Sequence, residues 1–527
     1  MNITLTQVRF LERAVKLFHS RTAVVCGGRR WTYSEYGERV ERLSNALEDL
    51  GIKPHDKVAY LGYNCHRLLE CYYGVVKIGA VLLPLNIRLS SSDIEYIVRE
   101  SEPKIILVDP DFLSKLEPIL KNIPSVKDFI ILKEMDKNVS WVTGVYDRLL
   151  EDASCWPKRP PGDYPFCEDD LSELFYTSGT TGPPKGVMLT HRNLFLHALE
   201  TMSVYPITET DVQIHLIPLF HVNGWGIPHY LTAKGGTHIM VQKFNTDDVL
   251  ELIQKEKVNR MYAIPTMIDA ILEHPKLKSY DLSSMRDILI GGAPPPTGMC
   301  AKTEKVFGRK VHSGFGMTET CPMMAAPELP DDLDEETYRH RAHETWGFPL
   351  IGAEFRVVDE SGNDLPWDGK AIGELLVRGD MVMKGYYKKE EETATALNGG
   401  WLHTGDLVSM DNEGSLYIRD RKKDIIISGG ENISSLEIEQ VLYSNPDILE
   451  CAVIGKLDPK WGEIPKAVVV LKPGAKMAPE DIIDWTRKKM AHFKALREAV
   501  IIKEMPRGGT GKILKSVLRK EHGQINS

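Results

Sequence analysis

A chain of 527 residues is too long for one hydrophobic core, so we expect a large region with subdomains and at least one smaller domain. Hydrophobic residues make up 42% of the chain and charged residues 26%, which excludes a disordered chain, a coiled coil and a disulfide scaffold. The 65 Lys and Arg against 74 Asp and Glu give a net charge of -9, which excludes a general binder of nucleic acid or of anionic membranes. An anionic ligand must therefore be held by local groups.

Several features favour a cytoplasmic location without a membrane span. The eight cysteines include no C-x-x-C pair, which is typical of reduced cytosolic thiols and not of a zinc or redox site. The first 20 residues have the apolar spacing of an amphipathic helix and not of a signal peptide. The most apolar stretch, Tyr72 to Asn86, carries Lys77 and is too short to cross a bilayer. The final QINS lacks the peroxisomal S-K-L signal.

The first predicted elements form two α/β units. From residue 32 to 110, strand-like runs alternate with helical segments, and TYSE at the start of the first helix has capping-box spacing. Residues 152–170 are rich in proline and charge and are interpreted as a surface connection. The second unit is expected to begin with the strand LSELFYT and to continue through VMLTH, DVQIHLIPL, RMYAIP, RDILIGG and KVHSGF.

Short strands from about Glu354 predict a smaller β-rich piece, and past Arg421 helices and strands alternate over about 100 residues. We therefore predict an α/β protein. Its large N-terminal domain, residues 1–420, contains two α/β subdomains and a small β-rich subdomain. A small α+β C-terminal domain follows at residues 421–527.

The strongest single feature is the string YTSGTTGPPKG, Tyr176 to Gly186. Glycines let the backbone N–H groups turn inward, hydroxyls donate further hydrogen bonds, and Lys185 adds a point charge, all of which suit phosphate. The spacing is not that of a Walker loop. A Gly/Ser/Thr run by itself is more often only a polar turn.

The complete string resembles the phosphate loop of the adenylate-forming superfamily, which includes acyl-CoA synthetases, luciferases and the adenylation domains of peptide synthetases. Further motifs occur in the superfamily's order along the whole chain, and the resemblance is greatest to medium- and long-chain fatty-acyl-CoA synthetases. It implies binding of ATP at Thr177, Ser178, Gly179, Thr180, Thr181, Gly182, Lys185, Gly314, Phe315, Gly316, Thr318, Asp406 and Arg421.

The segment GFGMTET, Gly314 to Thr320, is similar to the family's aromatic-Gly-x-Thr-Glu motif. The resemblance implies that Phe315 packs near adenine, that Thr318 reaches phosphate, and that Glu319, with Thr177, holds Mg²⁺. The family's usual residue at position 315 is Tyr. Phe315 keeps the stacking face but lacks the hydroxyl, so we expect stacking without that hydrogen bond.

The segment WLHTGDLV matches the family's T-G-D, whose aspartate, here Asp406, accepts hydrogen bonds from the ribose hydroxyls. Arg421 matches a second ribose contact. Lys423 matches the hinge about which the family rotates its mobile small domain between an adenylating and a thiol-transfer pose. Gly429 and Gly430 match the lining of the thiol tunnel, although a turn before a helix capped by Ser434 would also explain them.

The string PRGGTGKILK resembles the family's catalytic-lysine loop, with Lys512 as that lysine, although Gly508 and Thr510 depart from the commoner residues. In this chemistry a carboxylate oxygen attacks the α-phosphate, and two anions repel each other unless positive groups bridge them. Lys512, Lys185 and Mg²⁺ would spread the charge of the transition state. No protein nucleophile is needed.

In PLFHVNGWGIPH, His221 matches a family histidine beside the acyl carboxylate, and Trp225 matches a gating aromatic of fatty-acid-activating relatives. A Trp in an apolar run is also typical of core packing. The expected acyl pocket comprises Trp225, Asn223, Gly291, Gly292 and Ala293.

The sequence thus predicts an AMP-forming acid–thiol ligase that converts a carboxylic acid, expected to be a fatty acid, to acyl-AMP and then to acyl-CoA. The catalytic residues would be Lys512, Glu319 and His221, and the small molecules ATP, Mg²⁺, CoA and the acid. Alternatives are a carrier protein as acceptor, a luciferase-like oxygenase, a short thioether or aryl acid as substrate, and a non-catalytic scaffold of the same fold. A homodimer is an expectation that rests on the resemblance alone.

Overall fold

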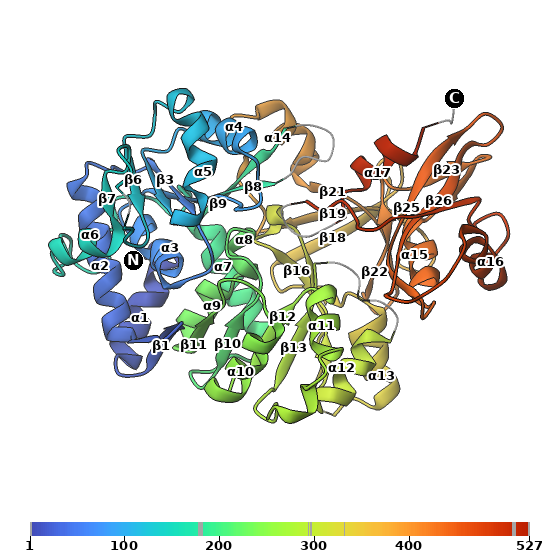
Figure 1. Ribbon diagram of the computed structural model, residues 1–527, viewed down its shortest axis with the longest axis horizontal. Coiled ribbons are helices and arrows are strands. Elements are labelled where there is room, and N and C mark those ends of the chain that lie inside the picture. Colours follow the sequence, from blue (N-terminus) through green and yellow to red (C-terminus); the bar gives the residue numbers. More distant parts are fainter. Residues whose placement is uncertain are drawn as a thin grey trace.

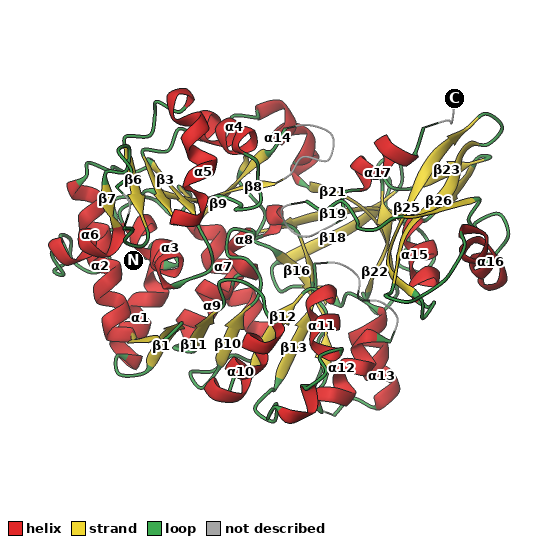
Figure 2. Cartoon of the chain, in the orientation of Figure 1, coloured by secondary structure: helices red, strands yellow, loops and turns green. Residues whose placement is uncertain are grey.

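The computed structural model describes residues 3–136, 138–177, 183–292, 295, 298–330, 332–508 and 513–524. A large region, blue to yellow in Figure 1, carries two sheets and their helices, and the C-terminal region, orange to red, carries a sheet of its own. Helices and strands are mixed along the whole chain (Figure 2), which confirms the predicted α/β class.

The first large sheet is mostly parallel. The two pairings at its β20 edge, β20 with β9 and β9 with β8, are antiparallel. In spatial order its described strands are β20 (Gly385–Tyr386), β9 (Lys185–Thr190), β8 (Leu171–Thr177), β4 (Val81–Pro84), β3 (Lys57–Leu61), β5 (Ile105–Val108), β6 (Asp128–Ile131) and β7 (Gly144–Val145).

The second large sheet is parallel except at its β1–β2 edge. In spatial order its described strands are β14 (Val311–His312), β13 (Asp287–Ile290), β12 (Arg260–Ala263), β10 (Val212–His215), β11 (Thr237–Met240), β1 (Thr22–Cys26) and β2 (Arg29–Thr32).

Two strands correct the predicted division into units. LSELFYT (β8) and VMLTH (in β9) join the first sheet and not the second, because β8 pairs with β4 and β9 with β8. The strands β1 and β2, which precede the first predicted unit, join the second sheet through β11. The two α/β halves therefore exchange strands, which local periodicity does not reveal.

The hydrophobic core has three layers across the two sheets. Along β3, Val58 and Tyr60 face an inner cluster between the sheets, whereas Ala59 and Leu61 face an outer cluster, as the two-residue period of a strand requires. The inner layer contains α2 (Tyr33–Asp49), α3 (His66–Lys77), α7 (His191–Val204) and α9 (Ile227–Lys234). The outer layers contain α4 (Ser91–Ser101) and α5 (Leu113–Leu116) on one side and α10 (Thr246–Glu256), α11 (Pro265–Leu272) and α12 (Met299–Phe307) on the other.

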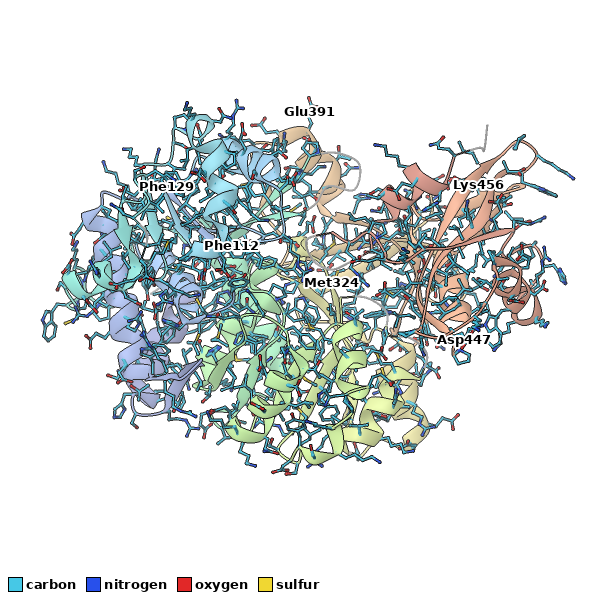
Figure 3. All side chains as sticks on the ribbon, viewed as in Figure 1. Phe112, Phe129, Met324, Glu391, Asp447 and Lys456 are labelled. Carbon is cyan, nitrogen blue, oxygen red and sulfur yellow. The ribbon has the colours of Figure 1, made fainter. Side chains whose placement is uncertain are left out.

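Smaller sheets complete the chain. The predicted β-rich piece is an antiparallel sheet of β18 (Ala353–Val358), β19 (Gly373–Gly379), β21 (Leu402–Met410) and β22 (Leu416–Arg421). A short sheet contains β15 (Phe315–Gly316), β16 (Met323–Ala326) and β17 (Phe348–Pro349). Figure 3 places Met324 of β16, which is fully buried, near the middle of the molecule.

The C-terminal region has the predicted α+β elements and two small cores of its own. Its strands are β23 (Ile426–Ser428), β24 (Glu431–Ile433), β25 (Ile448–Asp458), β26 (Gly462–Leu471) and β27 (Glu498–Ile501). Its helices are α15 (Ser435–Tyr443), α16 (Pro479–Lys489) and α17 (Lys515–His522). Asp447 and Lys456 mark this region in Figure 3.

Local signals set several helix ends. Thr32 and Glu35 form the predicted capping box at α2, and the Ser434 side chain caps α15. The remaining described helices are α1 (Val8–Phe18), α6 (Tyr146–Asp152), α8 (Val222–Trp225), α13 (Glu335–Arg339) and α14 (Glu390–Ala396). In the described part of the chain we find no helix with both the length and the apolar character needed to span a membrane.

Candidate active site

The ends of β8 and β9 hold the two sides of the predicted phosphate loop together. Thr177, the last residue of β8, and Lys185, the first of β9, are register partners, and Thr177 Oγ1 lies 3.5 Å from the Lys185 carbonyl oxygen. The predicted loop residues between them, Ser178, Gly179, Thr180, Thr181 and Gly182, lie outside the described residues. The antiparallel pairing nevertheless fixes the position of the Lys185 backbone beside the end of β8.

Lys185, Tyr386 and Glu319 meet at this point and are called the strand-end cluster. The Lys185 ammonium lies 5.0 Å from the centre of the Tyr386 ring, a cation–π contact. The Tyr386 hydroxyl donates a hydrogen bond of 2.9 Å to Glu319 Oε1. Tyr386 is positioned by β20, which pairs with β9, and Glu319 by the backbone bond from Met383 N–H to its carbonyl.

The charges of the strand-end cluster do not neutralise one another. Glu319 is 7% exposed, and within the described part of the chain neither Glu319 nor Lys185 forms an ion pair. Burial and the Glu319 carboxylate raise the pKa of Tyr386, so its hydroxyl remains a donor. An ammonium and a carboxylate separated by a neutral ring leave each charge available to a ligand.

Phe315 and Gly316 are positioned by the short β15–β16 pairing. A Cβ on Gly316 would lie 1.8 Å from the Pro322 carbonyl oxygen, so only glycine fits there. Phe315 is mostly buried and packs edge-to-face on Trp346, with 5.9 Å between ring centres. Thr318 and Glu319 lie together in the 3-10 turn Thr318–Thr320, and Gly314 precedes β15.

Asp406 and Arg421 face each other across β21 and β22. They are register partners, and Arg421 Nε lies 2.5 Å from Asp406 Oδ1. Asp406 is 2% exposed, and its N–H donates to Thr404 Oγ1 at 3.1 Å. The two predicted ribose contacts therefore form a charge-assisted pair with each other.

The predicted hinge residue, Lys423, is an exposed side chain between two buried carboxylates. Asp420 accepts hydrogen bonds from the Ser435 N–H at the start of α15 (2.6 Å) and from the Ser435 hydroxyl. Asp424 pairs with Arg519 of α17 at 2.5 Å. Both carboxylates thus bind groups of the C-terminal region.

Gly429 and Gly430 form the turn between β23 and β24, with φ of 62° and 89°. The Gly429 N–H donates to the Trp461 carbonyl at 2.8 Å. A turn before the helix capped by Ser434 is therefore observed, and the thiol-tunnel role stays a prediction.

Residues 222–226, of which the first four are the short element α8, form what we call the left-handed turn. All five have positive φ, and three of them, Val222, Asn223 and Trp225, are not glycine, a conformation that costs of the order of 1 kcal/mol or more for each non-glycine residue. Asn223 is fully buried and contacts Glu173 and Gly226, and its predicted pocket-lining role stays a prediction. His221 immediately precedes the turn and is part-buried.

The left-handed turn sets Trp225 against the end of β13. A Cβ on Gly291 would lie 3.1 Å from the Trp225 ring, and one on Gly292 would lie 3.2 Å from it. The indole therefore covers the bare backbone of these two glycines, and Trp225 is itself 8% exposed. Ala293, the remaining residue of the expected acyl pocket, lies outside the described residues.

Lys512 also lies outside the described residues. Arg507 and Ile513, which flank it, form an antiparallel bridge, and Arg507 pairs with Glu450 of β25. The two ends of this segment are thus anchored in the C-terminal region.

A cavity of about 870 Å³ lies elsewhere, between α1, α2, α7, α9 and residues 157–164. None of the predicted site residues that the structure describes lines it. Its wall combines apolar side chains such as Phe195 and Met202 with Arg9 and Lys16, and lacks the glycine-rich backbone that suits phosphate.

Sequence reasoning missed three residues of this arrangement. Tyr386 lies 67 residues from its partner Glu319. Glu173 stands in the predicted strand LSELFYT and His229 in the segment PLFHVNGWGIPH, and neither residue was given a role from the sequence alone. A Glu among the apolar residues of the predicted strand LSELFYT is a signal that could have found this network, since ionisable residues are seldom fully buried without a partner.

Family models match the chain over residues 11–387, as an AMP-binding enzyme, and over residues 437–512, as an AMP-binding enzyme C-terminal domain. A butyrate–CoA ligase of Arabidopsis thaliana is 34% identical, covering 98% of this chain and 93% of the relative. A long-chain-fatty-acid–CoA ligase of Thermus thermophilus is 36% identical, covering 97% and 95%. The crystal structure of the anthranilate CoA ligase AuaEII with anthranoyl-AMP matches with a TM-score of 0.90 at 26% identity, covering 99% of this chain and 98% of that one.

The chain belongs to the AMP-binding enzyme family, the adenylate-forming enzymes. Within it, the chain is an acyl-CoA synthetase, an AMP-forming acid–thiol ligase. Other matched relatives are named for benzoate and for ferulate, so the acids named among the relatives are both aliphatic and aromatic.

Proposed function

We propose that this synthetase activates a fatty acid with ATP to give acyl-AMP and pyrophosphate, and then transfers the acyl group to CoA. The observation that carries the proposal is the strand-end cluster, in which Lys185 and Glu319 both contact Tyr386 and, among the described residues, form no ion pair with each other. An ammonium and a carboxylate kept apart at the base of a glycine-rich loop are suited to a nucleotide polyphosphate and its cation.

In the first half-reaction the chain's own groups hold the nucleotide and reduce the repulsion between two anions. Lys185 and Lys512 are proposed to bind phosphate oxygens, and the hydroxyls of the phosphate loop to donate to them. Asp406 and Arg421 are proposed to hold the ribose, with Phe315 beside the adenine. His221 is proposed to hold the acid's carboxylate towards the α-phosphate.

The residues present fit Mg²⁺. Glu319 offers a carboxylate, and Thr177 a hydroxyl on the adjoining strand end, and oxygen atoms are the ligands that Mg²⁺ prefers. Within the described part of the chain no three acidic, His or Cys side chains gather into a metal cluster, so the protein would supply one or two ligands and the nucleotide phosphates the rest. When bound, the ion would neutralise charge on the departing pyrophosphate.

For the second half-reaction we propose a boundary between residues 1–420 and 421–527, with rotation at Lys423. The contacts of Asp420 with Ser435 and of Asp424 with Arg519 are the ones that such a rotation would change or carry along. Gly429 and Gly430 are proposed to line the path of CoA. The homodimer and the cytoplasmic location stay predictions, and several relatives are named as peroxisomal.

The choice of a fatty acid is supported by Trp225, which covers two glycines at the end of β13 and would open an apolar channel by moving away. A panel from propionate to palmitate, with benzoate and ferulate added, tests the proposal by pyrophosphate release with and without CoA. We expect the highest kcat/KM on an aliphatic acid and acyl-CoA only when CoA is present. Preference for an aromatic acid would overturn the fatty-acid assignment, and product formation on a carrier protein in place of CoA would overturn the acceptor.

A further inference from the structure

We infer that Glu173 is a positioning residue whose buried carboxylate holds the left-handed turn, and through it sets how Trp225 closes the acid site and which acids enter. This inference rests on the proposed function. Glu173 lies on β8, four residues before Thr177, so one strand would support both the nucleotide and the acid.

Among the described residues, the carboxylate of Glu173 has its polar contacts with the turn and with the helix that follows it. Its Oε2 accepts a hydrogen bond from Asn223 Nδ2 at 3.0 Å, and its Oε1 lies 2.9 Å from His229 Nε2 of α9. Asn223 Oδ1 in turn accepts the Gly226 N–H at 2.7 Å. One carboxylate therefore contacts both the turn that carries Trp225 and the helix that follows it.

Burial of these polar groups and the left-handed backbone both cost folding free energy, which indicates that the arrangement serves a function. Glu173 and Asn223 are 0% exposed and His229 is 1% exposed, so each polar group has lost its water. The left-handed backbone of Val222, Asn223 and Trp225 is unfavourable by itself and persists only where its surroundings fix it. The rings of Tyr72 and Tyr73 meet His229 edge-on, with centres 5.8 and 6.3 Å away, and keep it from swinging aside.

The consequence for the acid follows from the position of Trp225. Its ring lies against Gly291 and Gly292, where any added Cβ would lie within 3.3 Å of it. A small change in the turn would therefore change the width of the opening beside these glycines, without any direct contact between Glu173 and the acid. Glu173 acts through Trp225, so replacing Glu173 should change the KM for the acid.

The first test compares Glu173→Ala and Glu173→Gln with Ser172→Ala. Ser172 is a matched control, because it is equally buried on the same strand, bonds to Gln7 and contacts no part of the turn. We expect Glu173→Ala to raise the KM for the acid about 10-fold or more, and Glu173→Gln, which can keep the Asn223 bond, to raise it less. The KM for ATP should be unchanged, and the order of preference across the acid panel should change.

The second test is a double-mutant cycle with Trp225→Ala. If Glu173 acts through Trp225, Glu173→Gln has no further effect on the acid KM in the Trp225→Ala background. Fully additive effects would overturn the inference, as would Glu173→Gln behaving like Ser172→Ala. Thermal unfolding of each variant reports loss of folding, and Glu173→Gln keeps the test decisive where Glu173→Ala does not fold.

Failure of the proposed function would be visible separately. If the unaltered chain releases no pyrophosphate with any aliphatic acid, the substrate assignment fails before Glu173 is tested. If the chain is active and only the variants give the wrong pattern, the positioning role fails alone.

Discussion

The strand-end cluster and the left-handed turn adjoin the same strand, β8, and use polar groups in opposite ways. In the cluster, Lys185 lies over the Tyr386 ring and Glu319 accepts a hydrogen bond from the Tyr386 hydroxyl, so the charges of both remain available to a ligand. At the turn, the side chains of Glu173, Asn223 and His229 are buried, and Glu173 contacts the other two. The difference indicates that one set is built to meet a ligand and the other to fix a shape.

The largest effect should come from the lysine outside both regions. Lys512→Ala is expected to slow adenylation by roughly 10²-fold or more, because it removes a preorganised charge from the transition state. Exchange of labelled pyrophosphate into ATP measures that step. Thioester formation from supplied acyl-AMP is the control, and an equal loss there would place Lys512 in the other half-reaction.

Asp406→Asn tests whether the ribose, like the phosphates, is held by a charged group that remains available to the ligand. The change keeps the shape but removes the charge that pairs with Arg421 Nε at 2.5 Å. We expect kcat/KM for ATP to fall about 10- to 100-fold, the value of a hydrogen bond to a charged group. The KM for the acid should not change, and a change in it of similar size would argue against separate ribose and acid sites.

Tyr386→Phe is a milder change within the strand-end cluster. It keeps the ring under Lys185 and removes only the hydroxyl that donates to Glu319. We expect kcat to fall about 5- to 10-fold, as for one neutral donor, with a higher Mg²⁺ requirement. Activity equal to the unaltered chain across a Mg²⁺ titration would show that the hydroxyl does not position Glu319.

The smallest effect on activity, and a specific one on stability, concerns two fully buried histidines, His197 and His215. Burial lowers the pKa of His197 and of His215 to about 3. The unfolded chain takes up these protons below about pH 6.5 whereas the folded chain does not. The contribution of these two neutral rings to the free energy of unfolding is therefore fully present above about pH 6.5 and is lost as the pH drops towards 3.

Thermal unfolding between pH 7.5 and 5 measures this loss, and His215→Gln should reduce the pH dependence. Unfolding temperatures that do not change over this interval would contradict the burial of these rings as neutral groups.

Local signals were enough to predict much of the fold. Thr32 and Glu35, the Ser434 cap and the C-terminal elements from α15 onward follow from spacing and capping within a few residues, whereas the short strands β23 and β24 were not predicted. The membership of β8 and β9 in the first sheet was predicted wrongly, because pairing partners are not encoded in the period of a strand.

The candidate site divides in the same way. The glycine-rich loop, Glu319 and Asp406 stand in contiguous motifs and were predicted, whereas Tyr386 and the Glu173–His229 pair depend on contacts between segments far apart in the chain. Such contacts arise from packing of whole elements. A single sequence contains no spacing rule for them.

The pairing of β1 with β11 also has a consequence for synthesis. Val24 meets His238, more than 200 residues further along the chain. At about 5–20 residues per second, the apolar run TAVVC emerges from the ribosome roughly 10–40 s before its neighbour exists. During that interval its hairpin partner β2 covers only one edge, so the other edge is open to aggregation until β11 has been made.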